Sequence, residues 1–340
     1  MIWNSIKEKI PGFILVLFIV IFGSFISSYI NRYIMIETIT LVIFMGIIVN
    51  NTIGVKEVFQ PGITFIMNKV IKLAIILLGF KLNFTVLSAI GIKAFLLVIF
   101  FVPLVLFLGW KLGRFFDLES KTSLLIGIGS GICGVAAIMA LSPLVKAKKE
   151  DIVIAASITS FLGAIGVILF SFLGTLNNFP LNPTAFGIWS GISLHGVSHA
   201  IAAAFSMGET AGEAGTVVKL TRVLMLIPLS VIFTKHFYNE GEETSSTKYS
   251  VKNAWIQAFP LYVVVFLLVM VLNSVGVVPE KAGVFLGDLS SKLFLMTMTS
   301  MGLSLYLKNV LGTGIKGLKV GIILFSFVSI LSYNLIGMLY

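Results

Sequence analysis

The sequence is poor in charge, in acidic residues and in cysteine. Only 11% of its 340 residues are charged, and Asp and Glu together number 14 against 24 Lys and Arg. Charged residues make up roughly a quarter of soluble domains, so this scarcity excludes an ordinary water-soluble fold. The single cysteine, Cys133, excludes an internal disulfide and any cysteine-based zinc site, and it leaves the cellular compartment open.

Long apolar runs take the place of the missing charge. Hydrophobic residues make up 58% of the chain, and the mean hydropathy is +1.07. Residues 11–30, 152–176 and 254–279 carry no charge at all. A helix needs about 20 apolar residues to cross a bilayer, so each of these runs is long enough to span one.

The remaining apolar segments predict an all-α polytopic membrane protein with ten or eleven transmembrane helices. Each is long enough to cross but has a charge inside it or near one end. The predicted spans are 11–30, 36–53, 62–80, 86–110, 122–143, 152–176, 185–206, 214–234, 254–276, 282–306 and 317–338. They form a single transmembrane domain, residues 1–340, which the polar loop 236–252 divides into two unequal parts.

The distribution of Lys and Arg predicts the orientation. The net charge of +10 is scattered over short loops, which favours a membrane protein over a nucleic-acid-binding surface. Most of these residues lie on one side if the amino terminus is cytoplasmic, so we expect a multi-pass protein of the cell (plasma) membrane in that orientation. Lys146, Lys148 and Lys149 fall on the opposite side. Either the span 122–143 does not cross fully, or these lysines line an electropositive vestibule.

A shift of 223 residues aligns one part of the chain with another. The pairs are Lys69 with Lys292, Gly79 with Gly302, Leu82 with Leu305, Gly91 with Gly314, Ile92 with Ile315 and Lys93 with Lys316. Secondary transporters are commonly built from inverted repeats, and this short alignment keeps its phase without a gap. Chance matches in an apolar background are the other interpretation.

A glycine-rich segment lies within the predicted span 122–143. Residues 127–134 read Gly-Ile-Gly-Ser-Gly-Ile-Cys-Gly, and each glycine weakens a helix by about 1 kcal/mol relative to alanine. In lipid, backbone groups freed by a break need partners, so a break persists only beside a cavity or a ligand. The alternative is close packing of helices through small residues.

This break is a candidate anion site. A helix that restarts at Val135 directs its first N–H groups, and the positive end of its dipole, into the break. The residues that we predict to bind the substrate here are Gly129, Ser130, Gly131, Ile132, Cys133 and Gly134.

A second glycine- and serine-rich segment, residues 187–199, repeats the pattern within the span 185–206. The string Gly-x4-Gly-Val occurs at 129–135 and again at 191–197, so we expect two interrupted helices that meet at the midplane. Ser193, His195 and His199 are the candidate binding residues of this segment. The two histidines are one helical turn apart, and we weigh a polar helix contact, a role with substrate or a coupling proton, and a metal site.

Lys219 and Arg222 add basic charge at the start of an apolar span. Charge at this depth is usually functional, and the guanidinium fork suits oxyanions; snorkelling to the interface is the alternative. No uncharged run contains a deep Asp or Glu of the kind that carries Na⁺ or H⁺. The fixed charges available are basic, so we predict an anionic substrate.

The string Gly129-Ser-Gly-Ile-Cys-Gly134 resembles the bacterial family of multi-pass membrane proteins named as sulfate exporters. The likeness continues over most of the chain, at Ala137-Ile138, Pro143, Val145-Lys-Ala147, Leu77 to Leu82, His195, Ala202-Ala203, Lys219-Leu220, Arg222-Val223 and Pro228. That family is distantly similar to the cation–proton antiporter and bile-acid symporter group. The resemblance therefore implies inverted repeats, interrupted helices crossed at the site, elevator-like alternating access and a possible homodimer. Gly196 and His199 depart from the Glu and Gln typical of the family at these positions.

These observations predict a secondary active transporter of a small anion, namely sulfate, a sulfonate or a related oxyanion, coupled to a proton or Na⁺. We expect no enzyme activity and no cofactor. One alternative is an intramembrane metalloenzyme that uses His195 and His199 with Glu209 or Glu213. The other is an anion channel.

Overall fold

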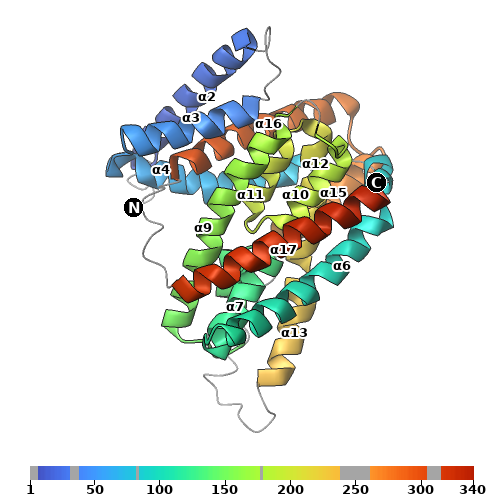
Figure 1. The fold of residues 1–340 in the computed structure, drawn as a ribbon. Helices are drawn as coiled ribbons and strands as arrows, with labels where there is room; N and C mark the ends of the chain where they lie inside the picture. Colours follow the sequence, from blue (N-terminus) through green and yellow to red (C-terminus); the bar gives the residue numbers. More distant parts are fainter. Residues whose placement is uncertain (1–6, 31–37, 82–83, 177–178, 238–260, 305–314) are drawn as a thin grey trace, which may run out of the picture.

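The structure is a computed structural model that describes residues 7–30, 38–81, 84–176, 179–237, 261–304 and 315–340 (Figure 1). These residues form helices and no strand, which confirms the all-α polytopic class. Among the described residues, six helical segments are long and apolar enough to cross a membrane: 10–29, 57–78, 90–115, 150–174, 209–237 and 315–339. The predicted loop 236–252 lies outside the described residues from position 238 onward.

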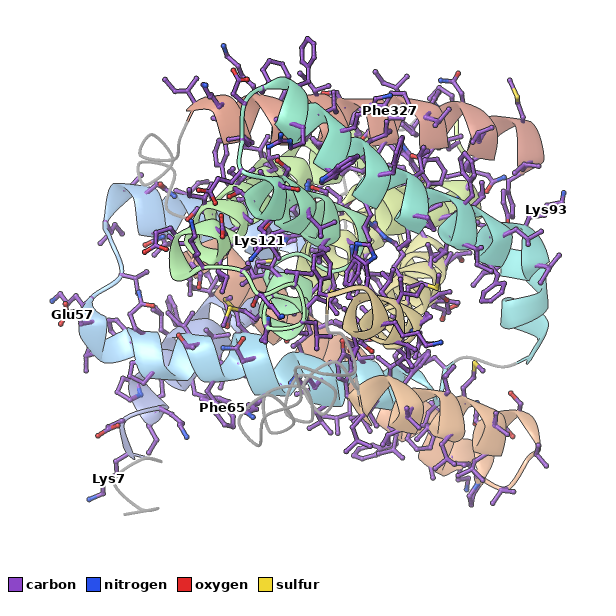
Figure 2. All side chains as sticks on the ribbon, turned by 90° about the horizontal axis from the view of Figure 1, so that it is seen from below. Lys7, Glu57, Phe65, Lys93, Lys121 and Phe327 are labelled. Carbon is purple, nitrogen blue, oxygen red and sulfur yellow. The ribbon has the colours of Figure 1, made fainter. Side chains whose placement is uncertain are left out.

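The helices form two layers, which we call the panel and the core (Figure 1). The panel contains α2 (Ile10–Ile30), α3 (Thr38–Thr52), η1 (Glu57–Phe59), α4 (Gln60–Phe65), the π-helix η2 (Ile66–Val70), α5 (Ile71–Leu78), α15 (Leu261–Ser274) and α16 (Glu280–Ser304). The core contains α6 (Phe84–Phe115), α7 (Ser120–Gly131), α8 (Val135–Leu141), α9 (Lys149–Gly174), α10 (Pro183–Ser193), α11 (Val197–Phe205), α12 (Glu209–Leu224), α13 (Leu226–Phe237) and α17 (Ile315–Leu339). Figure 2 shows α6 and α17 at one edge, marked by Lys93 and Phe327, and the panel helix of Glu57 and Phe65 at the opposite edge.

Helices α6 and α17 lie side by side and antiparallel. The Lys93 Nζ at the start of α6 donates to the Leu339 carbonyl at the end of α17, at 3.0 Å. At the other ends, Lys316 pairs with Asp117 at 3.6 Å. These contacts define the two faces of the molecule, which we call the Asp117 face and the Glu209 face. The second name refers to Glu209 because this residue pairs with Lys81, and Lys81 lies at the end of the panel segment just before α6.

The α7–α8 segment enters and leaves on the Asp117 face. The residues at its start contact the residues that follow its end: Thr122 donates to Asp151, and Lys148 Nζ lies 3.4 Å from Glu119. The predicted span 122–143 is therefore wrong as a crossing, because each arm is too short to traverse the bilayer and the break reverses the chain. Of the two interpretations of the lysines at 146–149, the structure selects the incomplete crossing.

The α10–α11 segment is a second re-entrant hairpin, from the opposite face. Asn182, which caps α10 by accepting from the Ala185 N–H at 2.9 Å, donates to the Tyr340 carbonyl at 3.3 Å. The following helix α12 begins with Glu209, which is paired to Lys81. Start and end thus lie on the Glu209 face, and the predicted crossing 185–206 is wrong for the same reason.

Equivalent contacts recur at the 223-residue offset seen in the sequence. Gly302 of α16 packs directly on the Ile43 carbonyl of α3, and a Cβ added at Gly79 would lie 2.9 Å from the Phe266 carbonyl of α15. Both pairs, 43 with 266 and 79 with 302, are separated by 223 residues. The contacts Lys93–Leu339 and Lys316–Asp117 are also related by this offset: Lys316 is 223 residues after Lys93, and Leu339 is 222 residues after Asp117.

This reciprocity is the pattern of an internal two-fold repeat. It relates α3, α5 and α6 to α15, α16 and α17, and α6 is antiparallel to its equivalent α17, so the repeat is inverted. The two hairpins have an offset of their own: their breaks, 132–134 and 194–196, are 62 residues apart. The two hairpins therefore do not follow the 223-residue offset. Along the chain both hairpins come before the second set of panel helices, α15 and α16.

Candidate functional site

The tips of the two hairpins meet in the middle of the molecule. Gly134 has a φ of 75°, a left-handed conformation that glycine adopts without strain, and it ends the break between α7 and α8. A Cβ at this position would lie 3.6 Å from the Gly196 nitrogen in the other break. The glycine pattern in the sequence thus coincides with two interrupted helices in contact.

Arg222 closes the carbonyl side of both breaks. It is 1% exposed. Its guanidinium donates to Gly131 O at 2.9 Å and Ser130 O at 2.6 Å in the first hairpin. In the second hairpin it donates to three carbonyls: Gly191 O at 2.9 Å, Leu194 O at 3.3 Å, and Ile192 O. One side chain therefore satisfies the C-terminal carbonyls of α7 and α10, where the helix dipoles place negative partial charge.

Lys219 has a similar position one turn earlier on α12. It is completely buried and its Nζ donates to the Leu194 carbonyl. The sequence predicts that Lys219 and Arg222 bind the anion. In the structure their donors point to backbone carbonyls, because buried carbonyls without partners are costly in the membrane interior. Their charge remains beside the breaks but does not line the open space.

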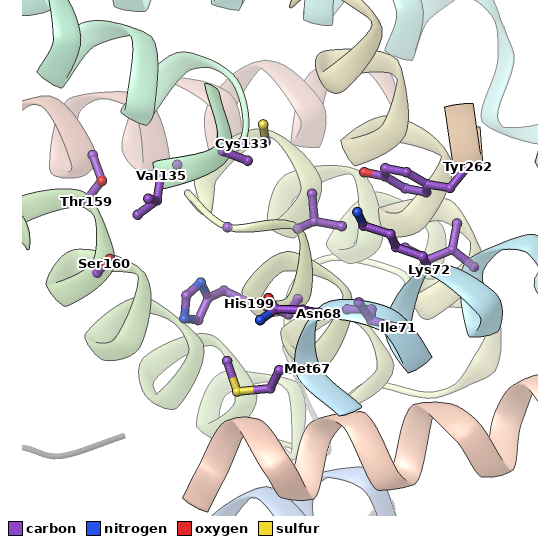
Figure 3. Close-up of a pocket in the computed structure, with 16 residues that line it drawn as sticks. Met67, Asn68, Ile71, Lys72, Cys133, Val135, Thr159, Ser160, His199 and Tyr262 are labelled. Atoms are coloured by element: carbon purple, nitrogen blue, oxygen red, sulfur yellow. The ribbon is translucent and has the colours of Figure 1, made fainter. Parts of the chain in front are cut away.

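A cavity of about 320 Å³ lies on the other side of the breaks, between the panel and the core (Figure 3). The core contributes segments 133–136, 159–160 and 196–199 to its lining. The panel contributes Met67, Asn68, Ile71, Lys72, Ile75 and Tyr262. Helices α8 and α11 begin at the cavity, and neither first turn has a side-chain cap.

Three of the predicted site residues line this cavity: Cys133, Gly134 and His199. Figure 3 shows the His199 ring near Asn68 and Met67. Within the described residues, the Nδ1 atom of His199 has no hydrogen-bond partner.

The other predicted residues lie behind the breaks. Gly129, Gly131 and Ile132 are buried in the helix packing. The Ser193 hydroxyl lies 3.1 Å from that of Ser332. His195 is 1% exposed and packs on Phe325, with ring centroids 5.4 Å apart. Both of its ring nitrogens, and the Ser130 hydroxyl, have no partner among the residues that the structure describes.

Sequence reasoning missed the panel side of the cavity. Lys72 is the one charged residue among those that line it, and its Nζ lies 5.7 Å from the centre of the Tyr262 ring. Asn68 lies in the π-helical turn that precedes Lys72, and such turns are frequent at functional sites. A basic residue in the middle of the predicted span 62–80 was the available signal, since a charge at membrane depth is a functional candidate by default.

The proposed metal ligands are not brought together. Glu209 pairs with Lys81, and His195 lies outside the cavity that His199 lines. No group of three His, Cys, Asp or Glu side chains suited to a metal occurs in the part of the chain that the structure describes.

Residues 11–321 match the family model described as "Conserved hypothetical protein 698". The chain is 29% identical over 338 residues to a UPF0324 membrane protein of Clostridium tetani, covering 96% of each chain. It is 31% identical over 299 residues to a UPF0324 membrane protein of Bacillus anthracis, covering 88% of this chain and 86% of the relative. A UPF0324 membrane protein of Yersinia pestis is 30% identical over 294 residues, covering 84% and 80% of the two chains.

Proposed function

Because this chain belongs to the UPF0324 family of membrane proteins, we propose that it is a secondary active transporter of a small anion that works by alternating access. The observation that carries the proposal is the cavity between panel and core, lined by the tips of two hairpins that enter from opposite faces. A site at the midplane where two interrupted segments meet is the arrangement typical of secondary transporters.

The electrostatics of the cavity favour an anion. The amino-terminal ends of α8 and α11 open onto it, and the positive ends of their dipoles point the same way. Lys72 faces the hairpin tips from the panel, while Lys219 and Arg222 add positive charge behind them. Among the described lining residues none is acidic, so nothing there neutralises this charge.

The contacts around the cavity support a conformation that is closed toward the Glu209 face. On that side the panel and core are joined by the Lys81–Glu209 ion pair, and Phe205 of α11 packs on Phe294 of α16 with ring centroids 5.3 Å apart. Tyr262, by contrast, comes from the end of α15 nearer the Asp117 face, because Asn273 at its other end donates to the Phe80 carbonyl at 2.9 Å.

The charge distribution supports assigning the Asp117 face to the cytoplasm. Lys111, Arg114 and Lys121 lie on this face, and the hairpin topology adds the lysines at 146, 148 and 149 to them. The excess of basic residues then follows the positive-inside rule more closely than it did with eleven crossings. This orientation has the amino terminus in the cytoplasm.

Flux measurements on the purified chain in liposomes test the proposal. We expect saturable counter-exchange of sulfate or a small sulfonate, and loss of at least tenfold in flux for Lys72→Met, which keeps the side-chain length but removes the charge. Lys69→Met is the matched control, since Lys69 lies in η2 just before α5, is exposed and does not line the cavity. The absence of flux with any small anion, under every imposed proton or Na⁺ gradient, would refute the proposal.

A further inference from the structure

The cavity combines a few polar groups with a cluster of apolar side chains on the panel, and this combination bears on the substrate. The core wall offers the backbone of the hairpin tips with Thr159, Ser160 and Ser198. The panel wall opposite them offers a cluster of Met67, Ile71 and Ile75, which we call the apolar wall, together with Asn68, Tyr262 and the single cation Lys72. We propose that the substrate is a monoanionic organic acid, with one sulfonate or carboxylate group on a short apolar body, and not a bare inorganic oxyanion.

The volume of the cavity exceeds what a bare oxyanion fills. A water molecule takes about 30 Å³ of the liquid, and a five-atom oxyanion is equivalent to roughly two or three waters. The cavity holds about 320 Å³, which lies at the lower end of the range for pockets that enclose small organic ligands. An inorganic ion therefore fills only part of this space.

The apolar wall discriminates against a small hydrated ion. An ion that enters loses water contacts, and the side chains of Met67, Ile71 and Ile75 offer nothing in return. An alkyl group against the same wall loses only unfavourable contact with water, and each buried methylene strengthens binding by about fourfold. The wall thus favours a substrate that carries carbon chain on the panel side.

The charge count favours a monoanion. Lys72 is the one charged side chain among the described lining residues. The donors of Lys219 and Arg222 bind carbonyls behind the breaks. These two residues therefore add positive electrostatic potential at the cavity but do not contact the substrate directly. Figure 3 shows the Lys72 amine beside the Tyr262 ring and across from the hairpin tip at Cys133, so a single cation faces the core side of the cavity.

Calorimetric titration of the purified full-length chain in nanodiscs tests the inference, which rests on the proposed function. The probes are inorganic sulfate, methanesulfonate, ethanesulfonate, propanesulfonate and butyrate. We expect affinity to rise about fourfold with each methylene, or about fifteenfold from methanesulfonate to propanesulfonate, with sulfate weaker than propanesulfonate. Butyrate separates a carboxylate head group from a sulfonate one, and either head group belongs to the proposed class.

A pair of variants isolates the apolar wall. Ile71→Ala removes part of that wall and is expected to flatten the dependence on chain length, while sulfate affinity stays unchanged. Ile47→Ala in α3 is the matched control, because Ile47 is 8% exposed against 7% for Ile71 and does not line the cavity. If Ile71→Ala does not fold, Ile71→Val provides the same comparison with a smaller change.

The outcomes separate this inference from the proposed function. Affinity that is independent of chain length, or sulfate that binds more tightly than propanesulfonate, overturns the inference while anion transport stands. Failure of all five probes to bind counts against the proposed function itself.

Discussion

At the scale of single residues, Arg222 shows how the interrupted helices are held. Five carbonyls from two hairpins converge on one guanidinium that is almost wholly buried. Lysine offers three donors from a single nitrogen and cannot span this set, whereas the planar fork of arginine reaches both hairpins at once. The residue therefore has a structural role at the site, beyond the charge that its position in the sequence suggested.

We expect Arg222→Lys to lower the stability of the protein more than its substrate affinity. Each buried carbonyl left without a donor costs about 1–3 kcal/mol, so the loss of two or more produces a large drop in Tm, measurable by thermal unfolding in detergent. Arg114→Lys is the control, since Arg114 is exposed. An unchanged Tm combined with weakened anion binding would show instead that Arg222 contacts the substrate.

At the scale of elements, two hairpins replace two predicted crossings. Hydropathy registers only that 122–143 and 185–206 are apolar and about as long as a bilayer is thick. Whether such a segment crosses or returns depends on the direction that the chain takes after the break. Contacts far apart in sequence, such as Thr122 with Asp151 and Asn182 with Tyr340, decide that direction.

The hairpin topology makes a prediction about accessibility. In a Cys133→Ser background, Glu119→Cys and Lys148→Cys are expected to react with a membrane-impermeant thiol reagent from the same face. Thr175→Cys, which follows the crossing helix α9, is expected to react only from the other face. Labelling of the first two positions from opposite faces would restore the crossing and exclude the hairpin.

At the scale of the whole molecule, the two-fold repeat suggests how the site is exposed to each face in turn. In the alternating access that we propose, the repeat makes the two conformations nearly equivalent in packing, so side chains that break the symmetry set the balance between them. The Lys81–Glu209 pair is one of these: the residue 223 positions after Lys81 is Ser304, whose hydroxyl donates to the Met67 sulfur at 3.0 Å. An ion pair thus joins panel and core at the Glu209 face, whereas the symmetry-related Ser304 contacts another panel residue, and on the proposed transport cycle this asymmetry favours the conformation closed at the Glu209 face.

Neutralising this pair should shift the balance. The Glu209 side chain is 57% exposed, and an exposed ion pair contributes at most about 1 kcal/mol. We therefore expect Lys81→Gln to raise the exposure of the cavity to the Glu209 face by up to about fivefold. The native Cys133, which lines the cavity, reports this as a faster reaction with an impermeant thiol reagent added on that face. Lys281→Gln, which removes the charge of an exposed lysine at the start of α16, is the control. Equal rates in Lys81→Gln and the wild type would remove the pair from the closing contacts.

The sequence by itself determined the membrane class, the family and the positions of both breaks, because apolar length and glycine clusters are local properties. It also contained the 223-residue repeat. It did not determine that the breaks reverse the chain, that Lys219 and Arg222 face carbonyls, or that Lys72 faces the cavity. Those features depend on which helix packs beside which, and long-range contacts between panel and core settle that only when the chain folds.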